Sequence, residues 1–293
     1  MSAQDFTVFL NGSYMPVQQA NISVLDRGFL FGDGVYEVIP VYGNTVFRLA
    51  EHLIRLENSL AAIDIKNPHS TSEWEDIFNE LVRRNPAGTD RSIYLEVTRG
   101  AGPGRDHLYD ATLVPTVFVM CRPVTPKIYD KGISVITHED IRWKYCNIKA
   151  VTLLPNILLK QIALKTDGSA EAILLRDGMV TEGSASNVFI VSNGKVTTPP
   201  KDRTILPGVT RDLLVELLHQ AGMPCEEAPL TEQQLRSADE VWITGSLAGI
   251  APVVQLDGHK VGSGVPGVHW KSAVQLFNDF KQGLQQAGSG LMA

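Results

Sequence analysis

Tight two-residue turns between short apolar runs restrict this chain to a fold with antiparallel strands. Dipeptides that combine glycine with asparagine or aspartate adopt the left-handed backbone that a two-residue hairpin needs. An apolar segment typical of a strand lies on each side of every such turn. The turns are Asn11-Gly12, Gly43-Asn44, Asp177-Gly178 and Asn193-Gly194, and the strand predicted after Gly43-Asn44 covers residues 45–49.

Other segments have apolar residues at helical spacing. They predict helices over residues 50–62, 74–84, 154–164, 210–220 and 269–280. Strands still outnumber helices, and many are joined by tight turns, so a mixed α+β fold is favoured over a regular parallel α/β sheet. The tail 283–293 is rich in glycine, alanine and glutamine and is predicted to fray.

The chain has 293 residues, which is more than one hydrophobic core usually needs. The stretch Arg122–Pro126 contains two prolines with polar neighbours and is typical of a linker. The sequence therefore predicts a small N-terminal α+β domain over residues 1–121, a linker over 122–129 and a larger C-terminal domain over 130–293.

Composition indicates an ordinary globular protein, with 44% hydrophobic and 20% charged residues. The net charge of −6 argues against a nucleic-acid partner, which would require a basic face. Cys121, Cys146 and Cys225 form no CxxC pair, so we expect a reducing compartment, no disulfides and no metal site. No apolar run is long enough for a membrane span, and the N-terminus has no signal-peptide pattern. The expected location is the cytoplasm.

Lys149 is a candidate nucleophile because of its apolar surroundings. It lies between Ile148 and Ala150, just before the apolar run 151–154. Burial lowers the pKa of a lysine, and a neutral amine can attack an aldehyde to form a Schiff base. A lysine whose ammonium reaches water is the commoner case, and local sequence alone does not separate the two.

Three further segments suggest an aldehyde cofactor with a phosphate. The turn Leu206–Arg211 opens a helix, where free N–H groups bind anions, although an ordinary helix cap is equally typical. Glu182 lies in a turn region and could protonate the ring nitrogen of pyridoxal 5′-phosphate (PLP), although surface turns also carry glutamates. Thr244-Gly245-Ser246 could approach a second phosphate oxygen. Together they indicate a PLP enzyme.

Longer motifs resemble one family, the class IV aminotransferases, which are the fold-type IV PLP enzymes. Within it the resemblance is strongest to the D-amino-acid transaminases and covers about residues 6–280. The stretches that carry it are Asp26–Glu37, Glu51–Leu56, Glu139–Trp143, Asn147–Lys149 and Val180–Asn187.

The resemblance implies roles for residues that bind the cofactor. Lys149 would hold PLP covalently and move the substrate Cα proton, and Glu182 would face the pyridine nitrogen. Arg55 would grip the phosphate, and His52 would lie near Trp143. The remaining implied phosphate contacts are Val209, Thr210, Gly245 and Ser246.

For substrates, the resemblance implies that Tyr36, Arg105 and His107 bind the carboxylate. A guanidinium meets a carboxylate through two parallel hydrogen bonds, although a solvated loop charge is the alternative for Arg105. Arg99–Asp110 is one residue longer than the usual loop of the family. In the family this loop reaches the neighbouring subunit, so a homodimer is expected.

The implied fold is a small α/β sandwich N-terminal domain followed by a larger mixed α/β barrel-like domain. The implied reaction is ping-pong transamination between D-amino acids such as D-alanine and 2-oxo acids such as 2-oxoglutarate. Three alternatives share the fold: a branched-chain L-amino-acid transaminase, an aminodeoxychorismate lyase and an (R)-amine transaminase. A PLP-binding protein without activity is a further alternative, because fold alone does not fix function.

Overall fold

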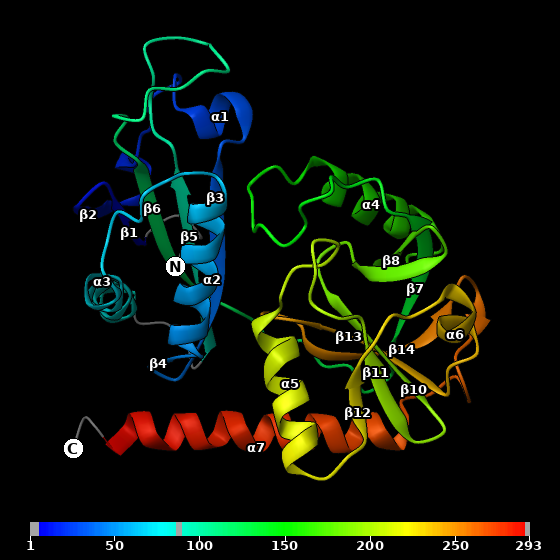
Figure 1. The fold of residues 1–293 in the computed structure, drawn as a ribbon. Coiled ribbons are helices and arrows are strands. Elements are labelled where there is room, and N and C mark those ends of the chain that lie inside the picture. Colours follow the sequence, from blue (N-terminus) through cyan, green and yellow to red (C-terminus); the bar gives the residue numbers. More distant parts are fainter. Residues whose placement is uncertain (1–5, 86–89, 291–293) are drawn as a thin grey trace. The chain divides into compact units, whose positions relative to one another are not determined.

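The computed structural model describes residues 6–85 and 90–290. The chain divides into two compact units (Figure 1). The first comprises residues 1–125, 148–152 and 284–293, and the second comprises 126–147 and 153–283. The segment that carries Lys149 therefore belongs to the first unit. The domain boundaries drawn from the sequence stay a prediction.

The first unit is built on a six-stranded antiparallel sheet in the order β2-β1-β6-β5-β3-β4. The turn Asn11-Gly12, with positive φ at both residues, joins β1 to β2. The strands are β1 (Thr7–Leu10), β2 (Ser13–Pro16), β3 (Gly34–Tyr42), β4 (Thr45–Val46), β5 (Asp90–Thr98) and β6 (Thr116–Pro123), and the helices are η1 (Val17–Gln19), α1 (Arg27–Phe31), α2 (Leu49–Ala62) and α3 (Thr71–Arg84).

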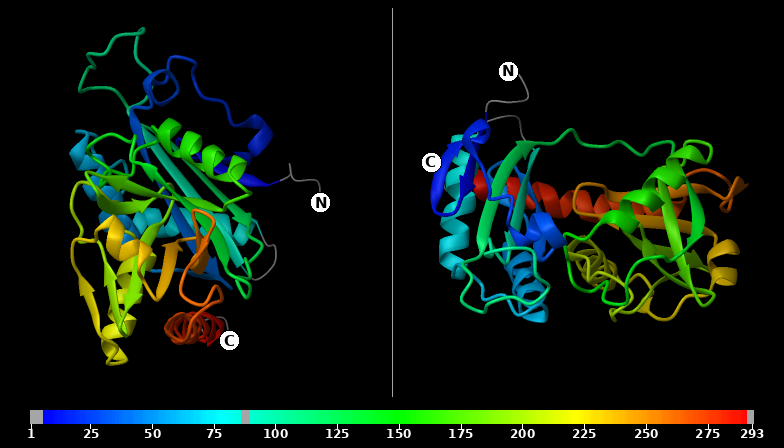
Figure 2. Two further views of the ribbon diagram at one scale, coloured as in Figure 1. Left: turned by 90° about the vertical axis from the view of Figure 1, so that its right-hand side faces the viewer. Right: turned by 90° about the horizontal axis from the view of Figure 1, so that it is seen from above.

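Helices α2 and α3 pack on one face of this sheet (Figures 1 and 2). Leu56 and Leu60 of α2 and Phe78 of α3 are fully buried against the strands, as expected for amphipathic helices. A capping box, in which Ser70 and Glu73 bond each other's backbone N–H groups, starts α3.

Side chains alternate between the two faces of the sheet, and this alternation places the candidate site. Glu37 of β3 faces the helices and is fully buried. Tyr36 is half-buried on the opposite face, and Glu96 of β5 is its partner in the register. The face without helices is therefore the one that presents Tyr36.

The second unit contains a nine-stranded mixed sheet that curls into a half-barrel. Its order is β12-β11-β10-β13-β14-β7-β8-β9, with β15 paired to β14. The strands are β7 (Ile133–Glu139), β8 (Glu171–Arg176), β9 (Met179–Gly183), β10 (Asn187–Ser192), β11 (Lys195–Thr198), β12 (Cys225–Glu227), β13 (Glu240–Gly245), β14 (Gly249–Leu256) and β15 (His259–Lys260).

Helices pack against several strands of this sheet. Helix α4 (Leu154–Lys165) lies against β7 and β8, where Leu159 and Ala163 are fully buried. Helix α5 (Val209–Gln220) packs on β12 and β13, and α6 (Glu232–Arg236) lies against β9. Helix α7 (Val268–Gly290) is the last element. No helix in the described residues is long and apolar enough to cross a membrane.

The predicted α+β fold is confirmed, as are the hairpins at the four turns. The five predicted helices are also present. Two expectations are wrong. The strand predicted over 45–49 ends at Val46, because Arg48 has a positive φ and caps α2. The tail does not fray from residue 283, because α7 continues to Gly290.

Candidate active site

Lys149 is held against strand β3 by its own backbone. The Tyr36 N–H donates to the Lys149 carbonyl at 2.9 Å, and the Lys149 N–H donates to Ser59 Oγ at 3.2 Å. The Lys149 amine lies 4.3 Å from the centroid of the Tyr36 ring. The amine is therefore placed over an aromatic face on the side of the sheet without helices.

Tyr36 belongs to a short aromatic row beside this amine. Its ring lies 5.8 Å from that of Tyr94, tilted by 31°. The Tyr94 hydroxyl donates to Glu96 Oε2 at 2.5 Å. Burial raises the pKa of Tyr94, and the hydrogen bond to Glu96 raises it further, so Tyr94 stays a proton donor at neutral pH.

Behind Tyr36, on the helix side of the sheet, Glu37 anchors a buried charge cluster. Arg55 donates through Nε to Glu37 Oε1 and through Nη2 to Oε2, both at 2.8 Å. His52 Nδ1 lies 2.8 Å from Oε2. Burial alone would raise the pKa of Glu37, but the Arg55 charge and the hydrogen bonds from Arg55 and His52 hold it well below its usual range.

The cluster contains Arg55 and His52, two residues that the family resemblance assigned to the site. Arg55 is buried and uses two nitrogens on Glu37, and its assignment to a phosphate stays a prediction. His52 is fully buried, and burial lowers its pKa. Its Nε2 has no hydrogen-bond partner within residues 6–85 and 90–290. The role of Glu37 was missed, because only the fold shows that it faces both residues.

Replacing Glu37 with glutamine is expected to destabilise the protein by about 3 kcal/mol at neutral pH, because the Arg55 charge stays buried without its partner. The folded pKa of Glu37 lies below the ordinary 4.5. Its carboxylate therefore stabilises the fold above about pH 4.5, and this contribution disappears as the pH falls towards the folded pKa. Denaturant unfolding at pH 7 and below pH 4 would measure both effects.

The exposed Glu75 of α3 gives the matched control, since Glu75→Gln removes the same charge from the surface. If both variants unfolded at the same denaturant concentration at pH 7, the proposed contribution of the Glu37 cluster would be wrong.

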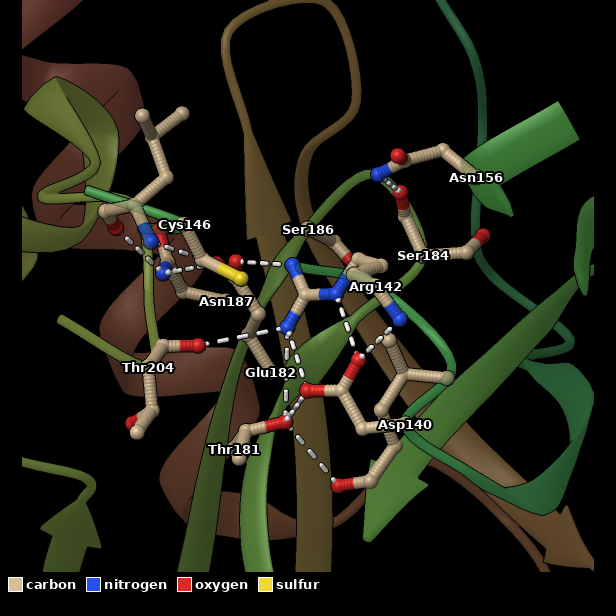
Figure 3. A network of polar contacts seen from close by, with 12 residues as sticks. Asp140, Arg142, Cys146, Asn156, Thr181, Glu182, Ser184, Ser186, Asn187 and Thr204 are labelled. Atoms are coloured by element: carbon tan, nitrogen blue, oxygen red, sulfur yellow. Dashed lines mark hydrogen bonds and ion pairs between the residues drawn. The ribbon is translucent and has the colours of Figure 1, made fainter. Parts of the chain in front are cut away.

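In the second unit, Glu182 of β9 is a buried carboxylate (Figure 3). Its Oε2 accepts hydrogen bonds from Asn187 Nδ2 at 3.1 Å and from the Leu206 N–H at 3.0 Å. Its Oε1 accepts from Arg142 Nη1. Burial raises the pKa of Glu182 to about 7, against the opposing charge of Arg142. Near neutral pH this group can therefore give or accept a proton.

Arg142 is in turn fixed by Asp140 (Figure 3). Asp140 accepts from Arg142 Nε and Nη2 at 2.9 Å each, and from Arg176 at 2.9 Å. The Thr181 hydroxyl donates to the same carboxylate at 3.1 Å. Neither Asp140 nor Arg142 was assigned a role from the sequence, although both lie in the quoted stretch Glu139–Trp143. The sequence did carry one signal for this pair, because Asp140 and Arg142 are opposite charges close together at the end of a strand.

The N-terminus of α5 has the properties of a phosphate site. Its N-cap, Gly208, provides no side-chain cap, so the N–H groups of the first turn are open to an anion. A Cβ at Gly208 would lie 2.0 Å from Asn187 Oδ1, so a larger residue there would have to displace the Asn187 side chain. The Thr210 hydroxyl is buried and has no hydrogen-bond partner among the described residues. An orphaned buried hydroxyl at a helix N-terminus fits a phosphate oxygen.

The predicted second phosphate contact lies at the end of β13. Gly245 and Ser246 are half-buried there, and Gly245 pairs with Gly249 across the turn. The preceding Thr244 hydroxyl is buried and also has no partner in the part of the chain that the structure describes. This turn therefore also offers hydroxyl groups that fit a phosphate.

The loop 99–110 brings two of the predicted substrate residues together. The Arg105 guanidinium lies 5.2 Å from the Phe31 ring centroid, and the His107 ring lies 5.5 Å from it. Both side chains are exposed. Tyr36, the third predicted residue, lies on β3 beside Lys149.

Among the described residues, no group of three or more His, Cys, Asp or Glu side chains could hold a metal ion. Cys121, Cys146 and Cys225 are all free thiols.

Comparison with known proteins agrees with the fold. The amino-transferase class IV family matches residues 34–256. A D-alanine aminotransferase from Bacillus licheniformis is 42% identical over 89% of this chain and 92% of its own length. A D-alanine aminotransferase from Staphylococcus haemolyticus is 35% identical over 93% and 97%. The crystal structure of a branched-chain aminotransferase from Thermoproteus uzoniensis is 27% identical, with a TM-score of 0.86, and the match covers 97% of each chain.

Fold, site and comparisons together define an enzyme that transfers amino groups with PLP as its cofactor. The chain belongs to the class IV aminotransferases. PLP supplies an aldehyde carbon that takes up the amino group and a ring that accepts electrons when the substrate Cα–H bond breaks. The buried Glu182 and the open N-terminus of α5 fit the ring nitrogen and the phosphate of this cofactor.

Proposed function

We propose that this chain transfers amino groups between D-amino acids such as D-alanine and 2-oxo acids such as 2-oxoglutarate, in a ping-pong reaction. The observation that carries this choice is the 42% identity, over nearly the whole chain, to a relative named D-alanine aminotransferase. The branched-chain relative of similar fold is only 27% identical.

In this proposal Lys149 carries the cofactor covalently and moves a proton between the substrate Cα and the cofactor C4′. The hydrogen bonds with Tyr36 and Ser59 fix the Lys149 backbone, from which the amine would move this proton. A positioned proton-transfer group of this kind typically accelerates a reaction by about 10² to 10⁴-fold.

Other side chains hold the cofactor from the ring and from the phosphate. Glu182 donates or shares a proton at the ring nitrogen. The hydrogen bond from Arg142 keeps the Glu182 carboxylate oriented. Arg55, the first turn of α5 at Val209 and Thr210, and the turn at Gly245 and Ser246 bind the phosphate. The support for the α5 contact is the orphaned Thr210 hydroxyl.

Tyr36, Arg105 and His107 bind the substrate carboxylate, and we propose that the loop 99–110 supplies the last two to a second copy of the chain. Apolar side chains on and near the loop are strongly exposed, Leu108 to 84% and Phe29 to 70%. Such exposure is typical of a surface that another protein covers. A homodimer therefore forms part of the proposal, and the cytoplasmic location expected from the sequence is kept in it.

The substrate assignment is tested with D-alanine and L-leucine, each with and without 2-oxoglutarate, and with aminodeoxychorismate alone. Pyruvate that forms from D-alanine only when 2-oxoglutarate is present would support D-specific transamination. The branched-chain transaminase is the second candidate, supported by the Thermoproteus uzoniensis structure, and it would use L-leucine instead. Pyruvate from aminodeoxychorismate alone would indicate the lyase.

Replacing Arg105 with alanine is expected to raise KM for D-alanine by about a hundredfold, because a charge-assisted bidentate contact is lost from the carboxylate. We expect kcat to change much less. Steady-state kinetics would measure both, with Arg122→Ala, an exposed arginine of the same unit, as control. An unchanged KM would exclude Arg105 from carboxylate binding.

A further inference from the structure

The motif Asp26–Glu37 contains a buried arginine, Arg27, that has no role in the proposed reaction. Arg27 lies at the start of α1, and only 6% of its side chain is exposed. Its Nη1 donates to the Asp106 carbonyl at 2.6 Å, and its Nη2 donates to the His107 carbonyl at 3.1 Å. One guanidinium thus bonds the backbone of consecutive residues directly after Arg105.

A second arginine braces this contact. Arg27 Nε pairs with Asp33 Oδ2 at 2.8 Å. Arg99 binds the same carboxylate through two nitrogens, Nε at 2.8 Å and Nη2 at 2.9 Å. Its guanidinium lies 3.7 Å from the centroid of the Tyr109 ring. Asp33 therefore joins two arginines that hold the far arm of the loop at separate points.

The base of the loop is fixed independently. Asp26 accepts hydrogen bonds from the hydroxyls of Thr98 and Thr116 at 2.8 and 2.6 Å, which ties the ends of β5 and β6 together. Gly100 has φ +90°, and a Cβ there would lie 1.9 Å from the Val114 carbonyl oxygen. Since these contacts set the base, the contacts of Arg27 determine the path of the chain around Arg105 and His107.

We propose that Arg27 is a positioning residue, which holds the 99–110 loop in the conformation that aims Arg105 and His107 at the substrate carboxylate. This inference rests on the proposed function of those two residues. Arg27 acts through main-chain oxygens, and its fork of donors matches two adjacent carbonyls in a way that a single ammonium does not.

The test uses the Arg27→Lys variant of the PLP-loaded enzyme. Lysine keeps the positive charge but lacks the forked N–H donors of the guanidinium. If the competent loop conformation falls to about a tenth of the population, apparent affinity falls in proportion. We expect KM for D-alanine to rise about tenfold at nearly constant kcat. We also expect amide hydrogen exchange in residues 102–110 to accelerate. Arg83→Lys, on the exposed end of α3, is the matched control and should change neither quantity.

A mutant cycle separates positioning from a general structural effect. If Arg27 acts through Arg105 and His107, Arg27→Lys should raise KM no further in a chain that already carries both Arg105→Ala and His107→Ala. Asp33→Asn weakens the same contact while Arg27 itself is kept, and it should give a smaller rise in KM. This variant provides the test if Arg27→Lys folds poorly.

Two results would overturn the inference: an unchanged KM with unchanged exchange, or a tenfold rise in KM that persists in the chain that carries both Arg105→Ala and His107→Ala. Failure of the proposed function would look different. The wild-type enzyme would then not use D-alanine, or Arg105→Ala would leave KM unaltered, while exchange in the loop would still report on the contact made by Arg27.

Discussion

Replacing Lys149 with alanine is expected to abolish amino transfer, with a loss in kcat of about ten-thousandfold. The variant has no amine to carry the cofactor and no group to move the Cα proton, and the latter loss alone reaches this size. The rate of the first half-reaction with D-alanine, followed by absorbance of the bound cofactor, would measure the effect. The wild-type enzyme is expected to show the visible absorbance band of a cofactor held by a lysine.

Borohydride reduction followed by intact-mass measurement gives an independent readout. The wild-type chain should gain the mass of the reduced cofactor, and Lys149→Ala should not. Lys144→Ala, which removes an exposed lysine five positions away, is the control and should behave as wild type. A cofactor that remained reducibly attached in the Lys149→Ala chain would show that another residue carries it.

Glu182→Gln is expected to lower kcat by at least about a hundredfold, because the ring nitrogen loses the acid that keeps it protonated. Glutamine retains the size of the side chain and an oxygen acceptor for Asn187 and Leu206. The cofactor should therefore remain bound, and the loss should lie in kcat. Single-turnover kinetics with D-alanine would measure it, and Glu139→Gln, an exposed carboxylate of the same unit, is the control.

The same substitution has a consequence for stability without cofactor. Burial raises the pKa of Glu182 from 4.5 to about 7. Ionisation therefore costs the folded state more than the unfolded state, and the Glu182 contribution to stability falls as pH rises from about 4.5 to about 7. Unfolding of the apo-protein across this range should show that decline in the wild type and not in Glu182→Gln. Parallel curves for both chains would contradict the raised pKa.

Much of the fold could be predicted because local signals agree with it. Glycine-containing turns identify hairpins, and helical spacing identifies the helices that pack on the sheets. Strand β14 was missed, since Pro252 interrupts its apolar run and proline disfavours a strand interior. The turn Asp257-Gly258, with positive φ at both residues, was the signal that could have revealed it.

The candidate site was less accessible to sequence reasoning. Lys149 was selected for its apolar neighbours and Glu182 for its place in a turn region, but these local signals are weak. Only the resemblance to a family separated the two residues from ordinary surface lysines and glutamates. Glu37, Asp140 and Arg142 were given no role from the sequence, since their roles depend on contacts between distant positions. Glu37 meets Arg55 across 18 positions and Asp140 meets Arg176 across 36, distances over which sequence patterns indicate no contact.

The contact that Arg27 makes with main-chain oxygens has an evolutionary implication. Every residue type has a carbonyl, so the side chains at 106 and 107 can change without weakening this grip. Residues nearer the tip, around Gly102–Gly104, lie outside it altogether. Substrate preference can therefore change through replacements and insertions at the tip while the contact made by Arg27 stays constant.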